Sequence, residues 1–297
     1  MTEPAFRDPQ ALRRSVTDHL GSLARADARL NLNDLLRQFA YDRLLCRVFS
    51  GAEADRWILK GATAMLARLG PEARHTLDVD LHRRSTQGLL RLKVAPGRPV
   101  AAATETRRVR VTVYLGATQF AVFPVDLVTN LDMTSVPEEI DPLLPVRISG
   151  MPATPYRVYP VPDHIADKVC ALHEVHERTG APAQPSTRYR DLVDLAVFAR
   201  TTRVDAGALI GAVRSERRHR RLALPKRLTV PSTADWPAGY AREIRNAPAV
   251  VDRTLDAAVE TVRRFIDPIL EGNAAGVWDP CLCHGSKGRD GAGDDQS

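Results

Sequence analysis

Apolar residues recur at helical spacing through the first fifty residues of the chain. In LNDLLRQFAYDRLLCRVF, Leu35, Phe39 and Phe49 lie near one face of a helix, and Asn33 is placed to cap its start. This pattern predicts a helical segment over residues 8 to about 56.

The pattern then changes from helical spacing to alternation. The stretch WILKGATAMLARLG begins with a short apolar run, meets Gly61 and continues as a helix-like segment to Gly70. Alternating or nearly continuous apolar residues follow in DVDLH at 78–82, RRVRVTVYL at 107–115 and FAVFPVDLVT at 120–129. We therefore expect a strand, a turn and a helix, followed by three more strands.

Helical spacing returns in the second half of the chain. A Pro-rich connection with little periodicity covers residues 131–162. Further helices are predicted over residues 163–178, 186–200, 205–222 and 248–271. The Gly-, Asp- and Ser-rich end of the chain predicts a disordered tail. The expected division is a helical segment, a core with strands, a helical domain and a tail, at residues 1–56, 57–160, 161–272 and 273–297.

Composition is that of an ordinary soluble globular protein. Of the 297 residues, 44% are hydrophobic and 26% are charged, and no apolar run is long enough to span a membrane. The start, MTEPAFRDPQALRRSV, lacks the apolar core of a signal peptide. Four cysteines show no disulfide-framework spacing. We therefore expect a cytoplasmic protein that does not engage a membrane.

Positive charge is concentrated in one run. The net charge is only +6, but RSERRHRR at 214–221 is closely followed by Lys226 and Arg227. Clustered positive charge favours a polyanionic partner such as nucleic acid. The run is equally compatible with a solvated helix face.

Two aspartates lie on one side of a predicted strand in RHTLDVDLHRR. Because side chains alternate along a strand, Asp78 and Asp80 point the same way, while Val79 between them points the other way. Two carboxylates this close repel each other unless a cation lies between them. Oxygen ligands suit Mg²⁺. Such a pair also occurs on ordinary protein surfaces.

A third aspartate lies within an apolar strand. Asp126 interrupts FPVDLVT, where an unpaired buried carboxylate would be costly. If this strand lies beside the first, Asp126 joins Asp78 and Asp80, and three carboxylates suit two-metal nucleotidyl transfer. Alternatively, Asp126 caps a strand end and pairs with an arginine.

The stretch LKGATAML places a glycine where a strand passes into a helix. Gly61 lets the backbone approach a phosphate, and the amides that follow point their N–H groups toward it. Thr63 adds a hydroxyl in the first turn. A simple turn glycine is the alternative.

Five motifs in this order resemble the AbiEii/AbiGii-type toxin family. The motifs are LKGATAML, RHTLDVDL, FPVDLV, HIADKVCAL and RYRDLVDLAVF, spread over residues 57–200. The family comprises DNA-polymerase-β-like nucleotidyltransferases, and the MenT-type tRNA-modifying toxins belong to it. The resemblance implies an α+β fold, with a small mixed sheet and flanking helices, plus a helical C-terminal domain.

The resemblance also implies roles for individual residues. In the nucleotide-binding turn, Ala62 stands where the superfamily often has Ser, so it supplies no hydroxyl. The implied set comprises the turn Lys60, Gly61, Ala62 and Thr63; the metal-binding Asp78, Asp80 and Asp126; the phosphate-contacting Lys168; and the last motif, Arg188, Arg190, Asp191 and Asp194. In that last motif, the resemblance implies that Asp191 is important for activity and that Arg190 binds the nucleotide.

The residues add structural expectations to two of these positions. Lys168, three residues after the core-facing Ile165, is expected at the border of an apolar helix face, from which it reaches into a cleft. Arg190 and Asp194 are spaced for an i, i+4 salt bridge.

The implied activity is transfer of a nucleoside monophosphate to an RNA acceptor. The substrate is an NTP (ATP, CTP, GTP or UTP), the cofactor is Mg²⁺ or Mn²⁺, and the acceptor is the 3′ end of tRNA, so that translation is blocked. A cognate antitoxin encoded nearby is the expected partner, with or without a stable complex. The alternatives are an aminoglycoside-type nucleotidyltransferase that modifies small molecules, and a non-catalytic RNA-binding protein on the same scaffold.

Overall fold

The structure is a computed structural model that describes residues 8–83, 96–100, 106–129, 131–143, 151–178, 181–184 and 186–281. The α-helices are α1 Pro9–Ala26, α2 Leu32–Phe49, α3 Gly61–Leu69, α4 Val161–His173, α5 Tyr189–Thr201, α6 Ala206–His219, α7 Asp235–Glu243 and α8 Leu255–Glu271. The strands are β1 Trp57–Lys60, β2 Val79–Arg83, β3 Pro96–Val100, β4 Thr106–Leu115, β5 Thr118–Val128, β6 Glu138–Ile140, β7 Tyr156–Val158, β8 His176–Arg178, β9 Ala181–Gln184, β10 Val204–Asp205 and β11 Val277–Trp278.

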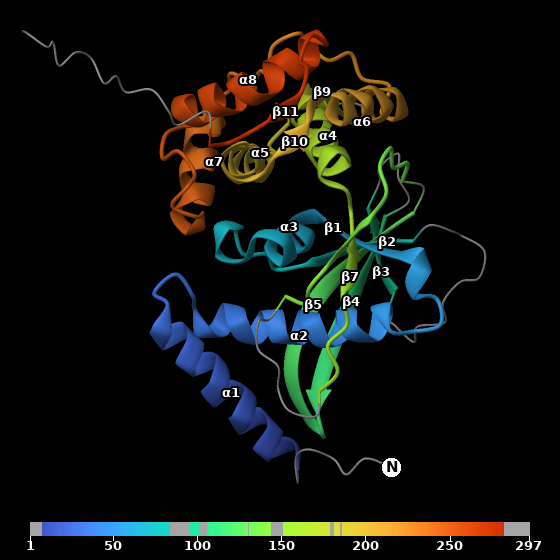
Figure 1. The fold of residues 1–297 in the computed structure, drawn as a ribbon, viewed down its shortest axis with the longest axis vertical. Helices are drawn as coiled ribbons and strands as arrows, with labels where there is room; N and C mark the ends of the chain where they lie inside the picture. The colour runs from blue at the N-terminus through green and yellow to red at the C-terminus, as the bar shows by residue number, and fades with distance from the viewer. Residues whose placement is uncertain are drawn as a thin grey trace, which may run out of the picture.

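A mixed seven-stranded sheet forms the centre of the fold. Its order is β3-β4-β5-β2-β1-β7-β6, with β2 parallel to β5 and β1 parallel to β7. The α+β class with a mixed sheet and flanking helices is therefore confirmed. Figure 1 shows α1 and α2 at one end of the molecule, where α2 runs across β4 and β5, and α4 to α8 at the other end.

The N-terminal helical segment consists of two helices. The side chain of Asn31, not the expected Asn33, caps α2 by accepting a hydrogen bond from the backbone N–H of Asn33 at 2.9 Å. Helix α1 packs on α2 through Val16 and Leu20. Helix α2 covers one sheet face, where Tyr41 meets Phe123 with ring centroids 4.6 Å apart. This apolar layer leaves the polar side chains of the strands on the opposite face.

The Pro-rich connection forms part of the sheet. Strand β7 pairs in parallel with β1 at Leu59 and Val158, and β6 pairs with β7. Both strands have only three residues, which is too short to produce an alternation that can be recognised in the sequence. Helix α4 follows β7 directly, so the sheet and the helical half are joined close to β1.

The C-terminal half differs from the expectation in its details. Helix α4 ends at His173 and β8 follows, and α8 begins at Leu255 with Thr254 as its cap, seven residues later than expected. Helix α7 was not predicted. Within the segment expected to be a disordered tail, β11 pairs with β10, and the Trp278 indole donates to the carbonyl of Ala199 at 3.0 Å. The remainder of that segment, 282–297, lies outside the described residues.

Within the described ranges, no helix combines the length and the apolar character that crossing a membrane requires.

Candidate active site

A row of four charged residues crosses four neighbouring strands. Arg108 on β4 pairs with Asp126 on β5, Asp126 pairs with Asp80 on β2, and Asp80 pairs with Lys60 on β1. Residues directly opposite each other in a sheet share one face. The expected meeting of Asp80 and Asp126 is therefore present, with a cation at each end of the row.

Asp78 lies immediately before β2 and is held by two threonines. Its backbone carbonyl accepts a hydrogen bond from the Thr63 hydroxyl at 2.8 Å, and its carboxylate accepts one from the Thr76 hydroxyl at 2.5 Å. The Thr63 side chain is fully buried. Thr63 therefore fixes the aspartate pair, and its hydroxyl is not directed at a phosphate as the sequence suggested.

The glycine turn contacts Asp80 directly. Gly61 has a φ of +62°, and a Cβ atom there would lie 1.8 Å from the Oδ2 of Asp80. No described side chain caps the start of α3, so its first backbone N–H groups stay available to an anion. Gly61 thus brings a helix start and a carboxylate into contact.

Asp80 carries negative charge in an unfavourable place. Burial and the neighbouring carboxylates of Asp78 and Asp126 together raise the pKa of Asp80 to about 7, although Lys60 and Lys168 oppose the rise. No described side chain donates a hydrogen bond to its carboxylate. A cation bound beside Asp80 would relieve both the burial cost and the repulsion.

The three carboxylates suit Mg²⁺ or Mn²⁺ by their chemistry, but one of them is engaged elsewhere. Arg108 donates two hydrogen bonds to Asp126, at 2.7 and 2.6 Å. Over the part of the chain that the structure describes, no three His, Cys, Asp or Glu side chains stand as a ready metal site. One element of each sequence interpretation of Asp126 is present: it lies opposite Asp80 in the sheet, and it pairs with an arginine. A metal ion fits the donor set once Asp126 leaves Arg108.

A second cluster joins the helical half to the sheet. The Lys168 ammonium lies 3.0 Å from Asp191 and 2.6 Å from Asp194, and Arg74 donates to both oxygens of Asp194, at 2.8 and 3.1 Å. Lys168 is therefore buried and neutralised, which corrects its expected place at the border of the helix face.

The expected salt bridge of Arg190 with Asp194 is also wrong. Arg190 instead pairs with Glu243 at 2.9 Å. Asp194 is fully buried, and its ion-pair partners among the described residues are Lys168 and Arg74.

The buried cluster stays charged because its members neutralise one another. Burial alone would raise the pKa of Asp194, but Lys168 and Arg74 lower it to about 2. Burial alone would lower the pKa of Lys168, but Asp194 and Asp191 together raise it. The cluster is therefore an ionic link between α4, α5 and the segment before β2.

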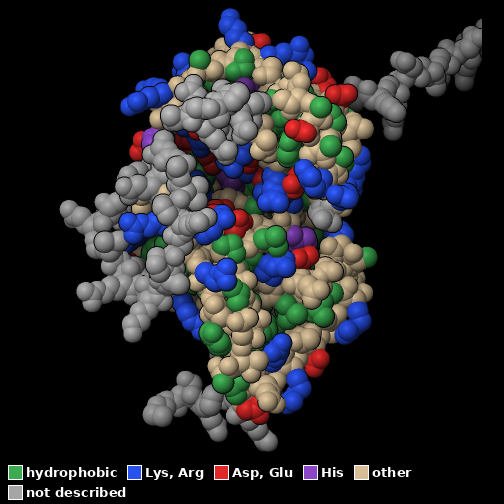
Figure 2. Space-filling view, turned by 180° about the vertical axis from the view of Figure 1, so that it is seen from behind, with side chains coloured by type: hydrophobic (Ala, Val, Ile, Leu, Met, Phe, Trp, Pro, Cys, Tyr) green, Lys and Arg blue, Asp and Glu red, His purple; other side chains and the backbone are tan. Residues whose placement is uncertain are grey.

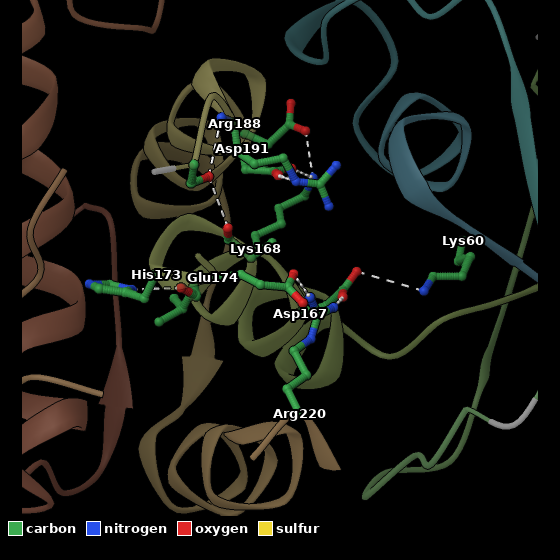
Figure 3. A network of polar contacts seen from close by, with 12 residues as sticks. Lys60, Asp167, Lys168, His173, Glu174, Arg188, Asp191 and Arg220 are labelled. Carbon is green, nitrogen blue, oxygen red and sulfur yellow. Dashed lines mark hydrogen bonds and ion pairs between the residues drawn. The ribbon is translucent and has the colours of Figure 1, made fainter. Parts of the chain in front are cut away.

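A third set of ion pairs reaches the glycine turn from the helical half. Lys60 lies 3.6 Å from Asp167 on α4, and Asp167 also pairs with Arg220. Figure 3 shows Asp167 between Lys60 and Arg220. Arg220 further pairs with Glu174 at 2.9 Å and Glu216 at 2.6 Å. Arg220 thus belongs to this network, although the sequence placed it in the nucleic-acid-binding run.

The other basic residues of that run lie at the surface. The exposed members are Arg214, Arg217, Arg218, Arg221, Lys226 and Arg227. Arg227 pairs with Asp267 at 3.4 Å. Figure 2 shows basic side chains over both the sheet half and the helical half of the molecule, with acidic and basic side chains in the hollow between the two halves. Arg220 lies within this run, so the run adjoins the ion-pair network that reaches Lys60.

Sequence reasoning missed Arg74, Arg108 and Asp167 as members of the site. Asp167 had a usable signal, since it precedes Lys168 in HIADKVCAL on a largely apolar helix. Arg108 and Arg74 looked like surface cations, and only their pairing across the fold distinguishes them from the other arginines nearby.

Comparisons with known proteins bear on the family and the fold. Residues 43–265 match the family described as nucleotidyl transferase AbiEii toxin, type IV toxin–antitoxin system. The fold is similar to that of MenT4, a nucleotidyltransferase toxin from Mycobacterium tuberculosis H37Rv, with a TM-score of 0.53 and 18% sequence identity over 86% of this chain and 89% of that one. In a sequence search, none of the curated proteins matches this chain.

Proposed function

Because the chain belongs to the AbiEii nucleotidyl transferase toxin family of type IV toxin–antitoxin systems, we propose that it transfers a nucleoside monophosphate from an NTP to the 3′ end of tRNA. Blocking that end in the cytoplasm would stop translation. The observation that carries the proposal is the pairing of Asp80 with Asp126 across β2 and β5, beside the Gly61 turn. It brings the acceptor-activating carboxylates to the start of a helix that can hold phosphates.

The carboxylates would hold Mg²⁺, or Mn²⁺ in its place. Asp78 and Asp80 would bind the metal from β2, and Asp126 would share it and orient the acceptor hydroxyl. The metal would neutralise the leaving pyrophosphate and lower the pKa of the attacking hydroxyl. The raised pKa of Asp80 supports this role, because a carboxylate that is costly to ionise alone gains most from a bound cation.

The Gly61 turn would hold the triphosphate. Backbone N–H groups of Gly61, Ala62 and Thr63 at the start of α3 would face the phosphates, so the missing hydroxyl at Ala62 does not matter. The Lys60 side chain is fixed by Asp167 and by the Tyr159 ring, whose centroid lies 5.1 Å from the ammonium. We propose that Lys60 adds positive charge beside these amides.

Lys168, Asp191 and Arg190 would act through the helical half. Lys168 reaches a phosphate only by giving up Asp191, which would then keep its pair with Arg188 at 3.0 Å. Arg190, 58% exposed, reaches one only by leaving Glu243. We propose that Asp191 positions Lys168, and that Lys168 in turn carries positive charge toward the nucleotide.

The exposed basic run would hold the RNA backbone. Arg217 and Arg218 at the end of α6 are exposed, while Arg220 in the same run is tied to Asp167. A phosphate backbone lying along this run would end near Lys60. Such binding weakens as salt rises, because it releases counterions from the RNA.

The partner that the family implies is a cognate antitoxin. We propose that the antitoxin is encoded nearby and counteracts the activity with or without a stable complex.

The test is a transfer assay with each radiolabelled NTP, Mg²⁺ and either total tRNA or a panel of aminoglycosides. We expect label on the tRNA 3′ end, none with Asp80→Asn, and full transfer with Asp256→Asn, which changes an exposed acid on α8. Label on the aminoglycosides alone would favour the small-molecule enzyme. Nucleotide-independent RNA binding without any transfer would favour the non-catalytic protein.

A further inference from the structure

The starting point is the state of the third carboxylate. The guanidinium of Arg108 contacts both oxygens of Asp126, whereas no described side chain donates a hydrogen bond to the carboxylate of Asp80. A planar guanidinium fits both oxygens of one carboxylate at once. Of the two adjacent acids, Asp126 is therefore neutralised and Asp80 is not.

The position of Arg108 matters for metal binding. A cation held by Asp80 and Asp126 must come between their carboxylates, and Arg108 already takes both oxygens of Asp126 from the other side. The Arg108 side chain is 50% exposed, and that of Asp126 is 14% exposed. Water solvates and screens a guanidinium that is half exposed, which weakens its ion pair with Asp126. Arg108 can therefore release Asp126 at low cost, while Asp126 stays fixed on its strand.

We propose that Arg108 is a placeholder cation of the active site. It pairs with Asp126 while no metal is bound, gives up Asp126 when the metal–nucleotide complex enters, and then pairs with the triphosphate. The exchange conserves favourable contacts, because the guanidinium leaves one oxyanion and meets another, and guanidinium binds phosphate as well as carboxylate. The inference rests on the proposed nucleotidyl transfer.

A purely structural role makes a different prediction. Arg108 and Asp126 are also a cross-strand pair of opposite charge, which stabilises a hairpin modestly. If that were the whole role, removing Arg108 would loosen the strand and weaken metal binding. A placeholder has the opposite effect, since it competes with the metal for Asp126.

The experiment measures Mn²⁺ binding to the full chain by the electron paramagnetic resonance signal of free Mn²⁺, with and without a non-hydrolysable NTP. Without nucleotide, we expect Arg108→Gln to bind Mn²⁺ roughly two- to fivefold more tightly than the unmodified chain. With nucleotide, the same variant should bind the Mn²⁺–NTP complex roughly tenfold more weakly. The two shifts have opposite signs, which loss of structure alone does not produce.

Two further variants complete the test. Arg110→Gln is the matched control, because Arg110 is exposed on the same face of β4 and lies opposite Pro124 in place of a carboxylate. It should leave both affinities unchanged. In the background of Asp126→Asn, Arg108→Gln should no longer tighten Mn²⁺ binding, since the group competed for is gone.

The outcomes separate this inference from the proposed function. If neither the unmodified chain nor Arg108→Gln binds Mn²⁺, the proposed metal-dependent transfer is wrong. If the unmodified chain binds Mn²⁺ through Asp80 and Arg108→Gln binds it equally or more weakly, the placeholder role is wrong and the proposed function stands.

Discussion

Gly61 and the carboxylate of Asp80 occupy adjoining space: a Cβ atom on Gly61 would lie 1.8 Å from Oδ2 of Asp80. The backbone of Gly61 also has a φ of +62°, which side-chain-bearing residues rarely adopt. The proposed phosphate-binding turn and the proposed metal-binding carboxylate thus depend on the same missing side chain.

Replacing Gly61 with Ala should displace the Asp80 carboxylate and abolish nucleotide transfer. The φ strain adds a cost of about 1–2 kcal/mol in the free energy of unfolding. The measurements are the transfer rate and the chemical unfolding curve. Gly70→Ala is the control, since Gly70 has a φ of +56° and a Cβ there meets nothing within 4 Å. It should lose stability but keep transfer, and equal loss of transfer in both variants would refute the explanation.

Replacing Asp80 with Asn should abolish transfer and stabilise the metal-free protein. The folded pKa of Asp80 is about 7, above the ordinary value near 3.9 for an unfolded chain. Ionising Asp80 therefore destabilises the fold increasingly from about pH 4 to pH 7, and fully above pH 7. The variant should match the unmodified chain at pH 4 and exceed its unfolding free energy by on the order of 4 kcal/mol at pH 8.

Chemical denaturation at several pH values, with a chelator present, measures this effect. A variant less stable than the unmodified chain at pH 8 would contradict it and would assign Asp80 a structural role. Addition of Mn²⁺ should stabilise the unmodified chain but not the variant.

Replacing Asp194 with Ala should destabilise the protein more than replacing Lys168 with Met. Loss of Asp194 leaves Arg74 buried without a described carboxylate partner, which costs about 3–5 kcal/mol. Loss of Lys168 is milder, because Asp194 keeps Arg74 and Asp191 keeps Arg188. Urea unfolding at pH 7 gives both values, and the reverse order would show that Lys168 is the centre of the cluster.

The same cluster gives a pH dependence. The pKa of Asp194 is lowered to about 2, so its contribution to stability is complete above pH 4 and is lost as the pH falls from about 4 toward 2. Asp194→Asn should remove this part of the acid dependence. If the unfolding free energies of the variant and the unmodified chain fell in parallel as the pH dropped below 4, the assignment would be contradicted.

Replacing Arg217 and Arg218 together with Gln should weaken tRNA binding and reduce its salt dependence by about two phosphate contacts. Both side chains are exposed, so the unfolding free energy should change by less than about 0.5 kcal/mol. Binding is measured by filter retention between low and moderate salt.

Arg220→Gln is the informative contrast. It breaks the contacts to Asp167, Glu174 and Glu216, so it should lower stability strongly. If Arg217 and Arg218 proved as important for folding as Arg220, the basic run would be a structural element.

The sequence alone predicted the candidate carboxylates, but it did not predict the basic residues that pair with them. Asp78, Asp80 and Asp126 interrupt apolar stretches, and the alternation of a strand shows which face they share. Counting back through the β4–β5 hairpin from the Leu115–Thr118 pair would place Arg108 opposite Val125. A register shift between Val113 and Tyr114 moves it opposite Asp126. Nothing in the residue pattern reveals such a shift.

Lys168 shows a second limit of periodicity. Its spacing from Ile165 describes α4 alone, where a lysine beside an apolar face usually reaches solvent. The actual environment of Lys168 depends on α5 and on Arg74, which pack over it from elsewhere in the chain. Most of the long helices and strands were predictable, but α7 was not, and β6 and β7 were missed because three residues carry too little pattern.

The ion pairs between the sheet and the helical half also determine when, during translation, the candidate site can be completed. Arg74 precedes Asp194 by 120 residues, and Lys60 likewise precedes Asp167. A ribosome therefore makes all three candidate metal-binding carboxylates long before the helices that hold Lys60 and Arg74 in place. We infer that a growing chain has the reactive groups without their supports. On the proposed function, the chain would become active only after most of its own translation is complete.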